Sequence, residues 1–186
     1  MQFIESWKNA VLNPKEFFSK AAEKTDGFGE GAKWIGISGL ITGLITAAVS
    51  FSKIGLMGAA LATLGAIVGA LIATIVFTAI LWLIARVFGG TGEFSRQYYG
   101  YAGFTAPLGI ASAVVALIPT VGTIAGIIIG LYSLYLTWLL IKMIHGLSSL
   151  KAILVILIPI IVIAVIVAAV GVAILGSMGL AAFGGS

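Results

Sequence analysis

The stretch VFGGTGEFSRQYYGY, residues 87–101, joins two long apolar segments and decides between two kinds of protein. It places three glycines within four positions, then Glu93 and Arg96, and then a run of tyrosines. Glycine-rich loops cradle phosphates in nucleotide-binding domains, but glycine also allows sharp turns between helices. The composition of the whole chain favours the second interpretation.

The composition is typical of an integral membrane protein. Of the 186 residues, 61% are hydrophobic and 9% are charged, with a mean hydropathy of +1.21, whereas soluble domains carry about 25% charged residues. The net charge of +4 does not indicate a nucleic-acid partner, because the ten cations are spread thinly between apolar runs. The absence of cysteine excludes disulfides, thiolate metal sites and a cysteine nucleophile.

The charges are segregated along the chain. Ten of the sixteen lie in residues 1–33, and apolar blocks follow. A membrane-spanning helix needs about 20 residues. We therefore expect an all-α polytopic membrane protein, with a cytoplasmic segment at residues 1–33 and a transmembrane domain at residues 34–186. The five predicted spans are about 34–51, 58–85, 102–118, 122–141 and 152–175, with a short turn at residues 53–57 between the first two.

The Lys and Arg residues predict the orientation. With five crossings, nine of the ten cations fall on one side of the membrane and only Lys53 falls on the other. By the positive-inside rule, the N-terminus is cytoplasmic and the C-terminus is outside or lumenal. In a prokaryote the membrane would be the plasma membrane.

The N-terminal segment predicts a pair of amphipathic helices at the membrane surface. In FIESWKNAVL the apolar residues recur at helical spacing, which places a single apolar stripe on the first helix. Such helices bury one face in the lipid interface, where the pair could dock a partner or wedge the leaflet; the alternative is that the pair only anchors the chain and packs beneath the bundle. The residues expected at the membrane surface are Phe3, Ile4, Trp7, Val11 and Phe17.

The second helix of the pair has a start signal of its own. Asn13 is the expected N-cap, Pro14 fits the first helical position, and Glu16 completes a capping box. This helix is predicted to end near Lys24, and TDGFGEG after it is expected to be a flexible joint.

The glycine loop does not match a nucleotide-binding fingerprint. A dinucleotide fingerprint needs a third glycine three residues after Gly92, where this chain has Ser95, and a Walker loop needs a lysine that is missing here. We therefore interpret the loop as a turn at the cytoplasmic interface, with its tyrosines at the depth of the lipid headgroups.

Four stretches follow one another in a characteristic order. They are VLNPKEFF before the first span, FGGTGEFSRQYYGYAGFTAP between the second and third, IP with a following glycine between the third and fourth, and HGLSSLKA before the last. Together they resemble the YIP domain family, the Ypt/Rab-interacting five-span membrane proteins. The matching positions are Asn13, Pro14, Phe18, Gly89, Gly90, Phe94, Tyr98, Gly100, Tyr101, Ala102, Pro107, Pro119, Gly122, Lys151 and Ala152.

The resemblance implies a cytoplasmic N-terminus, five spans and a short tail on the far side. Eukaryotic members of the family sit in early secretory membranes, associate with one another and with Rab-type GTPases, and are tied to vesicle trafficking and membrane shape. Because only 33 residues precede the first span, the resemblance favours a prokaryotic member, and a Rab-type GTPase is an expected partner only for a eukaryotic one.

The chemistry available in the chain predicts no enzyme. Hydrolysis would need a nucleophile with a base, or acids and histidines that hold a metal. All six acids are expected on the cytoplasmic side, and the single histidine, His145, is expected as a solvated residue of the last cytoplasmic loop. We therefore predict no catalytic residue, metal site or cofactor.

Glycines four residues apart predict close helix packing within the membrane. The pairs hold the five helices of one chain together, and the longest ridge, in the fourth span, is hypothesised to form a homodimer or to recruit another membrane protein. The helix-packing glycines are Gly39, Gly43, Gly65, Gly69, Gly122, Gly126 and Gly130.

The function expected from these observations is that of a non-enzymatic membrane scaffold or adaptor that binds partner proteins or shapes the bilayer through its cytoplasmic face. The alternative is a small-solute or ion pathway through the bundle. No Asp, Glu, Lys, Arg or His lies within the predicted spans, although such residues usually mark these pathways. Neutral candidates for a pathway are Ser38, Thr42, Thr46, Thr63, Thr74, Thr78, Ser133 and Thr137, whose ordinary role is hydrogen bonding within and between helices.

Overall fold

The computed structural model describes residues 2–183, and within them the side chains of residues 4–170; this part of the chain is helical and contains no strand. The predicted all-α class is therefore confirmed. The helices are α1 (Gln2–Leu12), α2 (Pro14–Glu23), α3 (Phe28–Val87), α4 (Phe94–Val115), α5 (Pro119–His145) and α6 (Ser149–Phe183).

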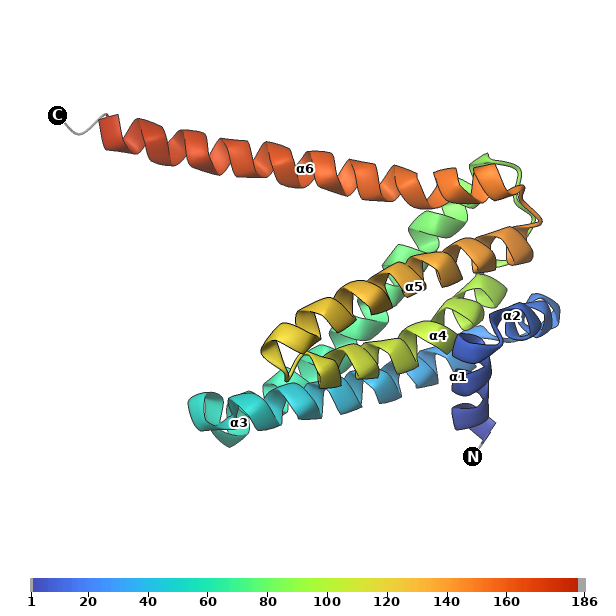
Figure 1. Ribbon diagram of the computed structural model, residues 1–186, viewed down its shortest axis with the longest axis horizontal. Coiled ribbons are helices and arrows are strands. Elements are labelled where there is room, and N and C mark those ends of the chain that lie inside the picture. The colour runs from blue at the N-terminus through green and yellow to red at the C-terminus, as the bar shows by residue number, and fades with distance from the viewer. Residues whose placement is uncertain (1, 184–186) are drawn as a thin grey trace.

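Helix α3 contains the first two predicted spans and folds back on itself (Figure 1). Its helical geometry is interrupted at Gly55, whose φ of +62° belongs to the left-handed region that glycine adopts without a steric penalty. This break lies within the turn expected at residues 53–57. The two arms run antiparallel, because Gly39 contacts Ile67 while Gly43 contacts Thr63.

Three of the described helices are long and apolar enough to cross a bilayer: α3, α5 and α6. The third predicted span falls in α4, which is not among them. The first half of α4 is rich in aromatic and polar residues that lie in the protein core instead of facing lipid, including the buried Gln97 and Tyr98. Tyr98 and Tyr99, which were expected at headgroup depth, are therefore buried in the core, in the part of α4 that precedes the predicted span 102–118.

Helix α4 is the centre of the bundle, in contact with α1, α2, α3 and α5 (Figure 1). Two glycines on α4 allow its neighbours to reach its backbone. A Cβ at Gly100 would overlap Leu140 of α5, and a Cβ at Gly103 would lie 2.5 Å from the Phe17 ring of α2. Close approach of this kind increases the dispersion contacts between helices.

Burial changes along the length of the bundle. The fully buried aromatic residues Phe18, Tyr98 and Phe104 lie where α4 meets α2, α3 and α5. Towards the bend of α3 and along α6 the exposed residues are mostly aliphatic, with exceptions such as Phe51 and Lys53 near the bend, and every residue from 160 to 170 is exposed. Figure 1 shows α6 diverging from α5. A bilayer is the environment that covers such aliphatic surfaces.

The α3 arms provide a test of this packing. In Gly43→Leu the new side chain would start 2.9 Å from the Cα of Thr63, so the arms must separate. We expect a loss of about 1–3 kcal/mol of stability, seen as a lower midpoint of thermal unfolding in detergent. Gly69→Leu is the matched control, because nothing lies within 4 Å of a Cβ at that position. Equal midpoints for the two variants would contradict the antiparallel packing.

Candidate functional site

The candidate site lies at one end of the bundle, which we call the loop end: the α3–α4 loop (residues 88–93), the α5–α6 loop (residues 146–148) and the helix ends that flank them. The two loops are joined directly, because the Thr91 amide donates a hydrogen bond of 3.3 Å to the His145 carbonyl. The Lys151 ammonium of α6 reaches the Phe88 carbonyl at 3.0 Å. The ends of α3, α4, α5 and α6 are thereby held together.

The glycines of the α3–α4 loop allow it to pass tightly against α5. Gly89 adopts a φ of +89°, and the Gly90 amide closes the turn on the Ala85 carbonyl at 2.8 Å. A Cβ at Gly92 would lie 2.6 Å from the carbonyl oxygen of Ile144. The Trp82 indole N–H donates to the Gly92 carbonyl at 3.0 Å. The loop is therefore a closely packed turn.

His145 is buried beneath this loop, so the expectation of a solvated histidine is wrong. Its side chain is 2% exposed, and Nδ1 lies 2.7 Å from a Cβ placed at Gly90. Its Nε2 lies 2.7 Å from Oε1 of Gln97, while Nε2 of Gln97 donates to the Thr78 carbonyl at 3.1 Å. Because the Gln97 amide nitrogen is the donor to Thr78, its oxygen accepts from His145 Nε2–H. The neighbouring Lys142 and Lys151 suggested that His145 faces solvent. However, α5 extends as far as His145, and the α3–α4 loop covers its side chain.

Cations and indole rings surround the loop end. Arg86 lies 5.1 Å from the centre of the Trp82 ring, and Lys142 lies 5.3 Å from that of Trp138. Lys142 also donates to the Ser149 hydroxyl at 3.0 Å. Cations over indole faces are typical of the interface between a membrane and water.

Helices α1 and α2 are packed against α4 and α5. Phe17 is 6% exposed and stacks on Tyr99 with ring centres 5.6 Å apart, and Phe18 is fully buried against Phe104. The Tyr132 hydroxyl of α5 donates to the Val11 carbonyl at 2.5 Å. One face of the α1–α2 pair is therefore part of the protein core.

The residues expected at the membrane surface fall in different environments. Phe17 faces the bundle, and Trp7 and Val11 are half-buried against the same core. Ile4 is 58% exposed. The side chain of Phe3 lies outside the described residues.

The start of α2 matches the expectation only in part. The helix begins at Pro14 with Asn13 in the N-cap position, but the Asn13 side chain makes no capping hydrogen bond. Glu16 instead pairs with Lys20 at 2.7 Å, which lowers the pKa of the Glu16 carboxyl. The predicted capping box is therefore wrong, and a salt bridge along the helix replaces it.

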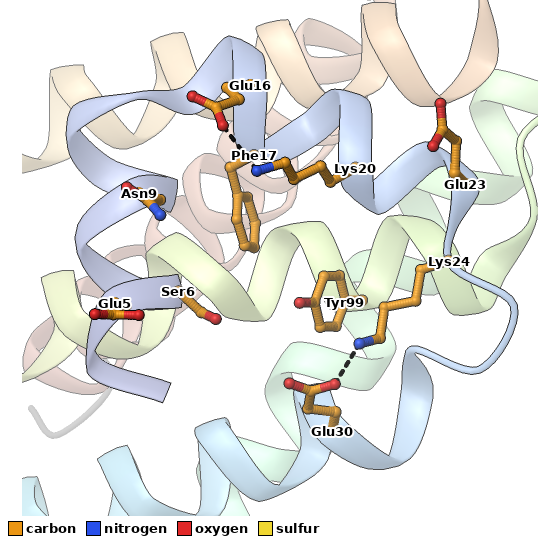
Figure 2. A pocket seen from close by; sticks show the side chains of 10 residues that line it. All are labelled: Glu5, Ser6, Asn9, Glu16, Phe17, Lys20, Glu23, Lys24, Glu30 and Tyr99. Atoms are coloured by element: carbon orange, nitrogen blue, oxygen red, sulfur yellow. Dashed lines mark hydrogen bonds and ion pairs between the residues drawn. The ribbon is translucent and has the colours of Figure 1, made fainter. Parts of the chain in front are cut away.

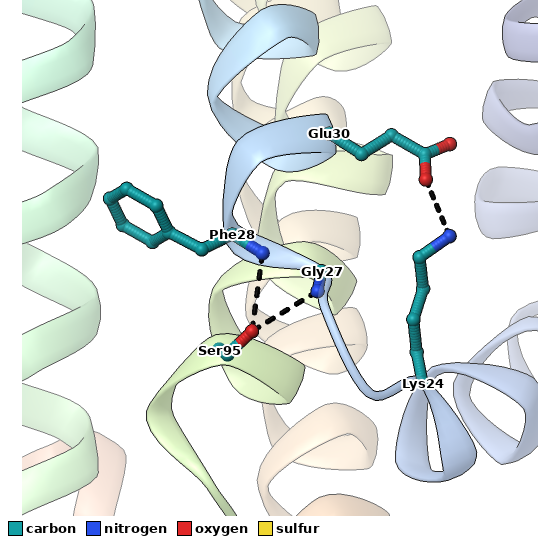
Figure 3. A network of polar contacts seen from close by, with 5 residues as sticks. All are labelled: Lys24, Gly27, Phe28, Glu30 and Ser95. Atoms are coloured by element: carbon teal, nitrogen blue, oxygen red, sulfur yellow. Dashed lines mark hydrogen bonds and ion pairs between the residues drawn. The ribbon is translucent and has the colours of Figure 1, made fainter.

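The joint after α2 is held in place (Figure 3). The Ser95 hydroxyl of α4 accepts hydrogen bonds from the Gly27 and Phe28 amides at 3.1 and 3.2 Å, so it satisfies two of the free N–H groups at the start of α3. Lys24 and Glu30 form an ion pair across the same joint. The expectation of a flexible joint is therefore wrong, because contacts from α4 and α3 fix it.

A polar pocket of about 450 Å³ lies between α1, α2, α4 and the start of α3 (Figure 2). The rings of Phe17 and Tyr99 line it, and charged side chains surround them. Burial lowers the pKa of the Lys24 ammonium, but the hydrogen bond to Glu30 and the nearby charges outweigh it, so the pKa is raised overall. The pocket residues are Glu5, Ser6, Asn9, Glu16, Phe17, Lys20, Glu23, Lys24, Glu30 and Tyr99.

The predicted packing glycines separate into two groups. Gly39 and Gly43 contact the other arm of α3, and a Cβ at Gly122 would overlap the Val115 carbonyl at the α4–α5 turn. The second group has nothing within 4 Å of an added Cβ. It consists of Gly65, Gly69, Gly126 and Gly130.

The remaining residues that match the YIP family lie at helix starts or within helices. Pro107 lies inside α4, Pro119 begins α5, and Ala152 is buried near the start of α6. Phe94 and Tyr98 form one aromatic row with Phe28. Tyr101 packs edge-on against Phe104.

Sequence reasoning missed three contact residues of α4: Gln97, which meets His145 beneath the loop, Ser95, which holds the joint before α3, and Tyr99, which lines the polar pocket. Gln97 offered a signal, since an amide in an aromatic run is a candidate for a buried hydrogen bond. Ser95 and Tyr99 carry no such signal in the sequence, because the residues that they contact lie far away along the chain.

Together, the apolar helices and the cationic and aromatic loop end define an integral membrane protein with several long helices. The family comparison matches the Yip1 domain over residues 8–171. The chain belongs to the Yip1 domain family. No curated protein and no solved structure matched the chain.

The buried pair of Gln97 and His145 can be tested by a double-mutant cycle. In Gln97→Leu, His145 Nε2–H loses its acceptor, and we expect a loss of about 1–3 kcal/mol of stability. Adding His145→Phe should recover part of the loss, because both polar partners are then removed. The measurement is the free energy of unfolding of the four proteins in detergent. Strictly additive losses would contradict the hydrogen bond.

Proposed function

We propose that this Yip1-domain protein is a non-enzymatic membrane scaffold or adaptor that works through its loop end and the adjoining α1–α2 pair. In this proposal the two arms of α3, α4, α5 and α6 make five crossings. The N-terminus and the loop end are cytoplasmic, because they carry all of the cations except Lys53. The C-terminus is outside or lumenal.

The observation that carries this proposal is the packing of α1 and α2 on the bundle. Phe17 and Phe18 are buried against α4 and α5, so the opposite face of the pair is presented at a fixed position. That face combines exposed apolar residues, such as Ile4 and Leu12, with exposed charges, such as Lys15. A rigid surface of this kind reduces the ordering cost of binding a partner.

A photo-crosslinking experiment tests the scaffold function. A benzophenone amino acid at Lys15 is compared with one at Ile163, an exposed aliphatic position of α6. In native membranes we expect discrete protein adducts from position 15, and position 163 serves as the control for contacts with lipid. Protein adducts no more abundant at 15 than at 163 would contradict the proposal.

A homodimer is a separate part of the proposal, supported by the open space beside Gly126 and Gly130 on α5. Small residues of this kind allow two membrane helices to approach closely. With Ile127→Cys as the only cysteine, we expect a disulfide-linked dimer in oxidised native membranes. Gly126→Leu should reduce its yield severalfold. A yield unchanged by Gly126→Leu would contradict the dimer.

A solute pathway is the second candidate function. The observation that favours it is a pair of fully buried hydroxyl groups, those of Thr78 and Tyr98, for which the structure gives no hydrogen-bond partner. Buried polar groups need partners, and a passing solute could supply them. Flux through purified protein in liposomes separates the two functions, and the scaffold predicts tight vesicles. Selective flux would overturn the scaffold proposal.

A further inference from the structure

The pocket between α1, α2, α4 and the start of α3 combines an aromatic wall with carboxylates (Figure 2). Phe17 and Tyr99 stack with an interplanar angle of 21°, and both side chains are more than nine-tenths buried. They are held rigidly, because Trp34 packs against Tyr99 from α3 at 4.8 Å. A rigid aromatic face beside acids is the arrangement that binds cations.

Ion pairing inside the pocket leaves an excess of negative charge. Lys20 pairs with Glu16, and Lys24 pairs with Glu30. Glu5 and Glu23 also line the pocket, and neither forms an ion pair within the described residues. Two carboxylates therefore remain available to a cationic ligand.

The protein's own Lys24 occupies the position that such a ligand would take. Its ammonium lies 4.4 Å from the centre of the Tyr99 ring while it is paired with Glu30 (Figure 3 shows the pair). The contact joins a cation–π interaction to a carboxylate, which is how an inserted Lys or Arg side chain would be held. Lys24 lies between α2 and α3 and outside both helices, so its side chain can leave without breaking either one.

We propose that this pocket binds a Lys or Arg side chain from a basic, extended segment of a partner protein, which displaces Lys24 from Tyr99 and Glu30. The inference rests on the proposed scaffold function and names the chemistry of the partner. Lys24 then acts as an internal competitor, and Glu5 and Glu23 attract the neighbouring cations of the same segment.

The lining of the pocket favours a soluble segment over the amine of a lipid headgroup. A bound lipid needs an apolar path for its acyl chains. The pocket residues include no aliphatic side chain, and its two aromatic residues are held in the core. The pocket therefore offers contacts to a charged, hydrated chain.

The test uses the full-length protein in nanodiscs of phosphatidylcholine, which has no net charge. The probe is a fluorescent nonapeptide of alternating Ser and Lys, and the control peptide carries acetyl-lysine in place of lysine, which removes the charge. Binding is measured by fluorescence anisotropy at two salt concentrations. We expect the lysine peptide to bind, to weaken with salt, and to bind at least fivefold more tightly than the acetylated peptide.

Two pairs of variants locate the binding. Lys24→Ala should strengthen binding of the lysine peptide about fivefold, whereas Lys8→Ala removes an equal charge from an exposed position outside the pocket and should have a smaller effect. The double variant Glu5→Gln with Glu23→Gln should weaken binding at least fivefold. Glu93→Gln, which removes an acid paired with Arg96 away from the pocket, should not.

Equal effects of Lys24→Ala and Lys8→Ala would overturn the proposal, since only general electrostatics would then remain. It would also be overturned if neither peptide bound, or if nanodiscs containing phosphatidylethanolamine abolished binding of the lysine peptide. Protein adducts from the crosslinker at Lys15 alongside any of these results would leave the scaffold function intact, so the two failures are distinguishable.

Discussion

The arrangement of the bundle depends on how closely two side chains approach the backbone of α4. Gly100 and Gly103 lie one turn apart, and they admit Leu140 from α5 and Phe17 from α2. Larger residues at these positions would separate the helices. Because Phe17 enters at Gly103, α1 and α2 become part of the core. The polar pocket exists for the same reason, since Phe17 and Tyr99 form its wall.

The loop end and the pocket present opposite charges. Cations and indoles surround the glycine loop, whereas carboxylates outnumber lysines in the pocket. In the proposed orientation the cations face an anionic leaflet, which attracts them. The acidic pocket would be repelled by the same leaflet, and it is better suited to a basic protein. Because the cations gather at the loop end and the carboxylates in the pocket, a protein with a net positive charge can still bind a cation.

The features that the sequence predicted well are those with local causes. Pro14 begins a helix as expected, because its fixed φ suits the first turn and it lacks an amide hydrogen. Gly55 allows the break in α3 within the expected turn. The missed features involve residues far apart in sequence: His145 meets Gln97 across 48 residues, and Ser95 meets Gly27 across 68. The capping box failed because Lys20 offers Glu16 a charged partner, which competes with an amide.

The most direct test of this account is amide hydrogen exchange over α1 and α2, measured by mass spectrometry on the protein in nanodiscs. The wild-type protein and Gly103→Leu are compared, because a side chain at Gly103 would occupy the space of the Phe17 ring. If α1 and α2 are held by the bundle, exchange in Gly103→Leu should be at least tenfold faster in both helices. If they merely lie on the lipid surface, the exchange rates of the two proteins will be equal, and that result would contradict the account.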